Sequence, residues 1–201
     1  MTTRAPNQTL DFYSGPLVWI DCEMTGLDPQ ADKIIEIAVL ITDRDLDLVD
    51  DGIEFVIRTD KEVLDRMDEW CTKQHGSSGL TQACLDSPHS TASVQTEVLA
   101  YIKKWIPEKR VAVLAGNTVH ADRAFLAREM PEIVDWLHYR IVDVSSIKEL
   151  HRRWYPRRPL PKTVFGGESK HRALDDIRGS IQELKWYRDN IFVSPEAYNP
   201  H

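Results

Sequence analysis

The sequence predicts an α/β fold in which one sheet packs against helices. Two observations support this class: three strand-like segments follow one another near the start, and strand and helix segments then alternate, as in parallel units. A length of 201 residues fits one compact domain. We divide the chain into an N-terminal extension (1–16), a domain (17–193) and a C-terminal tail (194–201).

Apolar and β-branched runs predict the first three strands. A continuous apolar run, 17–20, follows Pro16 and is typical of a strand buried on both faces. Residues 33–42 form a longer β-branched run, and residues 53–57 follow it after an acidic turn. The second and third strands are therefore expected to form a hairpin.

Two helices are expected next. Asp60 is placed to cap a helix that ends near Gly76 and carries five apolar residues at helical spacing: Val63, Leu64, Met67, Trp70 and Cys71. The second helix begins near Thr91, and Pro107 stops it.

The second half of the chain alternates strand and helix. The expected segments are a strand at 111–115, a helix at 121–130, a strand at 140–142, a helix at 145–154 and a last helix at 172–188. Residues 155–170 are rich in Pro, Gly and Arg, and this loop is too long to be simple filler. We expect it to border a site.

Charge and cysteine content limit the function classes. A net charge of −7 argues against a protein that coats nucleic acid by bulk electrostatics. Residues 148–172 are nevertheless locally basic, which fits either a solvated face or a surface beside an acidic site. Three scattered cysteines, no long apolar run and no apolar signal segment favour an intracellular protein, with cytoplasm and mitochondrion both open.

Carboxylates follow two of the predicted strands. Asp21 and Glu23 come directly after the first apolar run, and residues two apart on a strand point to the same face. Asp122 follows the fourth strand where a helix begins, and ligands collect at such strand ends in α/β sheets. Each has an ordinary alternative: a solvent-facing strand end, or an aspartate that satisfies helix N–H groups.

The start of the last helix adds a third acidic element. Its core stripe consists of Leu174, Ile177, Ile181 and Leu184. Asp176 lies roughly 110° from the centre of this stripe and Asp175 roughly 150°, so Asp176 borders the core. Small residues on the same side would let the helix approach the sheet closely: Ala173, Gly179 and Ser180.

Brought together, these carboxylates would repel one another unless cations neutralised them. Hard divalent cations prefer oxygen ligands, so two Mg²⁺ or Mn²⁺ ions are the natural occupants. A neutral His171 near them could accept a proton from water, although a lone histidine is more often a surface residue.

Several motifs carry a family resemblance over nearly the whole chain. They are residues 19–27, 34–38, 115–118, 122–126, 138–140, 143–146 and 171–177. With them the sequence resembles the DEDD exonucleases and, among these, the oligoribonucleases. The resemblance implies a ribonuclease H-like (RNase H-like) three-layer fold with a central mixed five-stranded sheet. The domain 17–193 would then be an exonuclease domain.

The resemblance also implies catalytic roles. Asp21, Glu23, Asp122 and Asp176 match the four acidic metal ligands, and His171 matches the general base. His171 stands five residues before Asp176, which indicates the histidine (DEDDh) subtype. The implied activity is 3′-to-5′ hydrolysis of short oligoribonucleotides, especially dinucleotides, to mononucleotides by two divalent cations.

Substrate contacts and a homodimer are implied as well. Leu27 would wedge against a terminal base, with Trp70 and His75 nearby. Thr118, Arg140, Ser145 and Ser146 resemble the group that caps the 5′ phosphate of a dinucleotide, and Tyr139 would come from the partner subunit. Trp70 could instead be a core residue. The alternatives for the whole chain are a DEDDh exonuclease for longer RNA or DNA, and a non-catalytic nucleotide-binding module.

Overall fold

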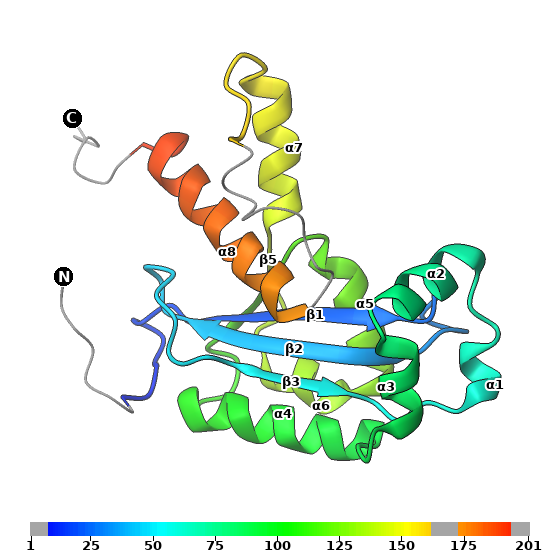
Figure 1. The fold of residues 1–201 in the computed structure, drawn as a ribbon. Helices are drawn as coiled ribbons and strands as arrows, with labels where there is room; N and C mark the ends of the chain where they lie inside the picture. The colour runs from blue at the N-terminus through cyan, green and yellow to red at the C-terminus, as the bar shows by residue number, and fades with distance from the viewer. Residues whose placement is uncertain (1–7, 162–172, 194–201) are drawn as a thin grey trace, which may run out of the picture.

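A computed structural model describes residues 8–161 and 173–193 and shows one mixed sheet at its centre (Figure 1). The five strands are β1 (Leu17–Met24), β2 (Ile34–Thr42), β3 (Ile53–Val56), β4 (Val113–Gly116) and β5 (Ile141–Asp143). Their order is β3-β2-β1-β4-β5. Only β2 among them runs opposite to the others, because it pairs antiparallel with both β1 and β3 while β4 and β5 pair in parallel.

Alternate residues of β1 separate the two faces of the sheet. Val18 and Ile20 belong to a core shared with α4 (Thr91–Trp105), α5 (Val119–Glu129) and α6 (Pro131–Trp136). Trp19 belongs to a second core on the opposite face, shared with α7 (Val144–Trp154) and α8 (Ala173–Asn190). Helices therefore cover both faces, and the predicted three-layer architecture is confirmed (Figure 1).

Three short helices lie beyond β3 at one end of the molecule (Figure 1). They are α1 (Lys61–Leu64), α2 (Glu69–Ser77) and α3 (Leu80–Asp86). Leu64, Leu80 and Cys84 from this region pack on Ile35 of β2 as a separate small cluster.

The prediction of one helix from Asp60 to Gly76 is wrong. Two helices occupy this stretch, because the carboxylate of Asp68 accepts the backbone N–H of Cys71 and so caps a new helix, α2. Asp60 precedes α1 without such a side-chain bond. Trp70 is 66% exposed, which excludes its alternative role as a core residue.

The other predicted elements are present with ends shifted by a few residues, but α3 and α6 were not predicted. On α8, Ala173 and Ser180 are buried as expected of small residues that face the sheet. A side-chain carbon added at Gly179 would meet nothing within 4 Å, so the expectation of a close approach there is wrong.

Some expectations lie outside the described residues. These are the ones on residues 1–7, on the loop beyond residue 161, on His171 and on the tail from 194. Residues 8–16 lie along the domain, since Leu10 is buried and its N–H donates to the carbonyl of Trp105. Among the helices that the structure describes, none has the length and apolar character needed to cross a membrane.

Candidate active site

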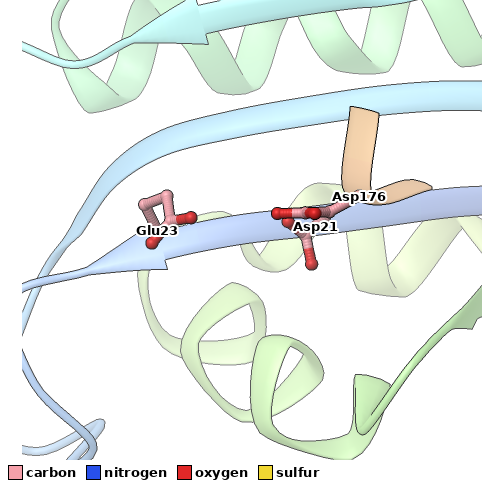
Figure 2. A group of neighbouring side chains, drawn as sticks. All are labelled: Asp21, Glu23 and Asp176. Atoms are coloured by element: carbon pink, nitrogen blue, oxygen red, sulfur yellow. The ribbon is translucent and has the colours of Figure 1, made fainter. Parts of the chain in front are cut away.

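Three carboxylates from two elements meet at the C-terminal half of the central strand, β1 (Figure 2). One oxygen atom from each of Asp21, Glu23 and Asp176 lies within 4.8 Å of the other two. Asp21 and Glu23 share the face of β1 that carries Trp19, and Asp176 stands in the first turn of α8. Because α8 packs across β1 and β2 on this face, its first turn brings Asp176 to the strand.

Asp122 approaches the same stretch of β1 from α5. The parallel partner β4 pairs with β1 only as far as Trp19, so the N–H of Cys22 lacks a strand partner on that side. The carboxylate of Asp122 accepts this N–H at 3.0 Å and is itself buried. Asp122 is thus tied to the residue between Asp21 and Glu23, although it lies outside the group of three.

Burial and crowding raise the pKa of these carboxyls. Burial raises the pKa of Asp21 well above its usual range, and the charges of Asp122 and Glu23 add to this. Burial, followed by the charge of Glu36 across the strand pair, raises the pKa of Glu23 to about 7. Burial also raises the pKa of Asp122 to about 7. A crowded set of oxygen ligands that resists ionisation by itself fits hard divalent cations.

His75 lies behind Glu23. It is buried on α2, and its Nε2 donates to the carbonyl of Met24 at 2.9 Å, which leaves Nδ1 4.0 Å from the carboxylate of Glu23. Burial lowers the pKa of His75, so its imidazole is neutral at pH 7. The structure therefore places His75 against the acidic group.

The loop between β1 and β2 presents Leu27, which is 89% exposed. The carboxylate of Asp32 organises this loop, because it accepts the hydroxyl of Thr25 at 3.1 Å and the N–H of Asp28 at 2.9 Å. A side-chain carbon at Gly26 would lie 2.4 Å from this carboxylate, so a larger residue there would displace the Asp32 side chain. Leu27 is thus presented to solvent by a loop that the Asp32 carboxylate ties together.

Two of the four residues expected to cap a phosphate are in contact. The N–H of Thr118 donates both to Oδ1 of Asp143 and to Oγ of Ser145, each at 2.9 Å. The two hydroxyls of Thr118 and Ser145 lie 3.0 Å apart. Ser146, the next residue after Ser145, is exposed to solvent.

Tyr139 and Arg140 lie in the turn before β5. The ring of Tyr139 is 68% exposed and stacks on His138, with centroids 4.4 Å apart. The guanidinium of Arg140 lies 5.3 Å from the centre of the Tyr139 ring. Both side chains are exposed, so they can reach a ligand or a second subunit.

The locally basic segment is partly used inside the fold. Lys148 forms an ion pair at 3.1 Å with Glu183, which is 1% exposed. Arg152 pairs with Glu149 on its own helix. In the described part of the segment, these residues therefore stabilise α7 and α8.

Sequence reasoning missed three polar residues that hold the site together: Asp32, Asn117 and Asp143. Asp143 accepts from the N–H groups of Thr118 and Ser145 and so joins two separate loops. Asn117 and Asp143 belong to motifs that signalled the family, but spacing alone did not indicate what their side chains bind.

Comparison with known proteins agrees with this arrangement. The exonuclease family matches residues 18–184, which is most of the chain, so the fold and site define a nuclease of the exonuclease class. An oligoribonuclease of Rhodococcus jostii is 51% identical over 88% of this chain and 88% of its own length. A mitochondrial oligoribonuclease of Saccharomyces cerevisiae is 50% identical over 90% of this chain and 69% of its own. The chain belongs to the oligoribonucleases, which confirms the resemblance.

A solved structure supports the fold. E. coli exonuclease I, in a zinc-bound complex with single-stranded DNA, superimposes with a TM-score of 0.70 at 13% identity. The likeness covers 89% of this chain and 41% of exonuclease I, so this chain spans about two fifths of that protein. The expected RNase H-like fold is confirmed.

Proposed function

We propose that this protein is a 3′-to-5′ exoribonuclease that hydrolyses short single-stranded RNA, dinucleotides in particular, to mononucleotides. Its sequence is about 50% identical to those of oligoribonucleases over most of the chain, which supports this substrate class. The observation that carries the proposal is the meeting of Asp21, Glu23 and Asp176 at the central strand of the sheet.

Four carboxylates would hold the cofactor: Asp21, Glu23, Asp122 and Asp176. Two divalent cations, Mg²⁺ or Mn²⁺, would activate a water molecule and stabilise the leaving oxygen when bound. The crowding of oxygen ligands and the raised pKa of Glu23, about 7, support a site that needs cations to ionise fully.

His171 is proposed as the general base that takes the proton from the attacking water. Its support is its place in the sequence, five residues before Asp176. An imidazole is also the side chain most easily poised for proton transfer near neutral pH.

Contacts with the bases and with the 5′ phosphate of the substrate are proposed as well. Leu27 and Trp70 would contact the bases, and the high exposure of both side chains supports this. His75 would border the site through Glu23. The 5′ phosphate would be capped by the hydroxyls and the guanidinium of four residues: Thr118, Arg140, Ser145 and Ser146.

A homodimer is proposed in which Tyr139 reaches the site of the partner. Exposed apolar residues support a protein contact, since Leu150 is 42% exposed, Trp154 67% and Tyr139 68%. Light scattering of the purified protein should give the mass of two chains, and Tyr139→Ala should lower activity. A monomer with full activity would contradict this part of the proposal.

An intracellular location, in the cytoplasm or the mitochondrion, is also proposed. The three free and buried cysteines suit a reducing compartment. A relative from yeast carries the description mitochondrial, which keeps that organelle in the proposal.

Hydrolysis of a diribonucleotide by the wild type and by Asp21→Asn tests the proposal. With Mg²⁺ or Mn²⁺ the wild type should release mononucleotides, and chelation or Asp21→Asn should abolish release. Binding of the dinucleotide without any hydrolysis under these conditions would instead support the nucleotide-binding module.

A further inference from the structure

A continuous chain of hydrogen bonds links the expected phosphate-capping hydroxyls to the helix that carries Asp176. The hydroxyl of Ser145 donates to Oδ1 of Asn117 at 3.1 Å. Nδ2 of Asn117 donates to the hydroxyl of Ser180 at 2.7 Å, and that hydroxyl donates to the carbonyl of Asp176 at 3.0 Å. We call these four residues the Asn117 chain.

A buried charge supports the middle of this chain. Nδ2 of Asn117 also lies 3.4 Å from Oε2 of Glu183, which is 1% exposed. Glu183 has two further partners, the hydroxyl of Tyr187 at 3.0 Å and Lys148 at 3.1 Å. It would therefore remain paired if the amide of Asn117 were removed.

The direction of each hydrogen bond in the Asn117 chain is fixed. An amide nitrogen can only donate, so the hydroxyl of Ser180 must accept from Asn117. Its own proton is then donated to the carbonyl of Asp176. The amide oxygen of Asn117 can only accept, so it takes the proton of Ser145. Because the proton of the Ser145 hydroxyl is donated to Asn117, its oxygen is left to accept, and it accepts the N–H of Thr118 at 2.9 Å.

We propose that Asn117 is a positioning residue that fixes the separation between the phosphate-capping hydroxyls and Asp176. This inference rests on the proposed function, because it concerns how that site selects substrate length. A dinucleotide with a 5′ phosphate has one scissile bond and one terminal phosphate at a set distance. A rigid separation therefore lets phosphate binding place the scissile bond at the carboxylates.

Breaking the Asn117 chain should uncouple the two ends. The hydroxyl of Ser145 would then keep only its contacts with Thr118, and α8 would lose its side-chain hydrogen bond to the residue that follows β4. Phosphate binding would no longer place the scissile bond, so the benefit of the 5′ phosphate to the reaction should fall. A substrate without that phosphate depends on this separation less, so its hydrolysis should fall by a smaller factor.

The test compares kcat/KM for a 5′-phosphorylated and an unphosphorylated diribonucleotide of the same sequence. In the wild type the phosphorylated substrate should be preferred by about 10-fold or more, as a charge-assisted hydrogen bond provides. Asn117→Ala should lower this preference about 10-fold, mainly through kcat. Its activity on the unphosphorylated substrate should fall by a clearly smaller factor.

Two further variants sharpen the test. Ser180→Ala cuts the chain at its next link and should lower the preference in the same direction, which keeps the test available if Asn117→Ala fails to fold. Gln182→Ala lies on the exposed side of the same helix and should leave the preference unchanged.

An equal loss of activity on both substrates would overturn the inference, since a merely structural role affects both alike. An unchanged preference in Asn117→Ala would overturn it too, while leaving the proposed function intact. Absence of dinucleotide hydrolysis in the wild type would instead refute the proposed function, and the inference with it.

Discussion

The carboxylate of Asp122 accepts the backbone N–H of Cys22, the residue between Asp21 and Glu23, at 3.0 Å. This bond gives Asp122 a structural role besides its proposed role as a metal ligand, because it completes the hydrogen bonding of β1 beyond the end of β4. Variants that keep or remove the side-chain oxygen at position 122 can separate the structural role from the role in metal binding.

Asp122→Asn should keep the fold and lose activity. The amide oxygen can still accept from Cys22, while the charge that a cation needs is gone. Asp122→Ala should lose activity as well, and should also unfold more easily by about 1–3 kcal/mol because a buried N–H is left without a partner. Urea denaturation of both variants checks this, and equal stability of the two would contradict a structural role for the Asp122 side chain.

Without cations, the protein should become less stable as the pH rises. The folded-state pKa of Glu23 and of Asp122 is raised to about 7, and that of Asp21 is raised well above its usual range. A raised pKa means that these groups favour folding while protonated, so their contribution is full below about pH 4 and is lost as the pH passes 7.

Melting temperatures in the presence of a chelator should therefore fall between pH 5.5 and pH 8. Added Mg²⁺ or Mn²⁺ should raise the melting temperature more at pH 8 than at pH 5.5, since the carboxyls must ionise to bind a cation. Asp21→Asn should weaken both effects. A melting temperature of the chelated wild type that rises over this range would contradict the account.

Asp32→Ala should mimic the loss of Leu27. The carboxylate of Asp32 holds the loop that presents Leu27, so removing either should raise KM for a dinucleotide more than it lowers kcat. The double variant should be little worse than Leu27→Ala alone, with a coupling of about 0.5–3 kcal/mol between the two positions. Gln30→Ala, an exposed side chain of the same loop, serves as the control. Fully additive effects would show that the loop does not act through Leu27.

His171→Ala should slow the chemical step by about 10² to 10⁴-fold, the usual contribution of a general base. Metal binding should persist, because the proposed ligands are carboxylates. Single-turnover kinetics and cation titration measure the two properties separately. A loss of cation affinity as large as that of Asp176→Asn would make His171 a ligand instead.

The sequence predicted β2 clearly because this strand buries every residue. All nine residues of β2 are buried, and such continuous apolar runs are a strong local pattern. The position of Asp176 beside the core follows for a similar reason, since the core stripe of α8 fixes which side faces the sheet and Asp175 is exposed.

Features that depend on distant contacts could not be predicted. The break between α1 and α2 follows from a cap at Asp68 that competes with a continuous helical pattern. The bond from Cys22 to Asp122 joins residues 100 apart, and the Asn117 chain joins three separate elements. The spacing of residues in the sequence does not indicate these side-chain partners, because they meet only when the helices and strands pack together.

Substrate-length profiling tests the central claim most directly. The kcat/KM for a 5′-phosphorylated diribonucleotide is compared with that for a 20-nucleotide RNA under the same Mg²⁺ or Mn²⁺ concentration. Under the proposal, only the dinucleotide can reach both the proposed phosphate-capping group and the carboxylates with its single scissile bond, so it should be preferred by about 10 to 150-fold. Arg140→Ala should remove much of that preference. Equal efficiency on the two substrates would contradict the account and favour a general DEDDh exonuclease of longer RNA or DNA.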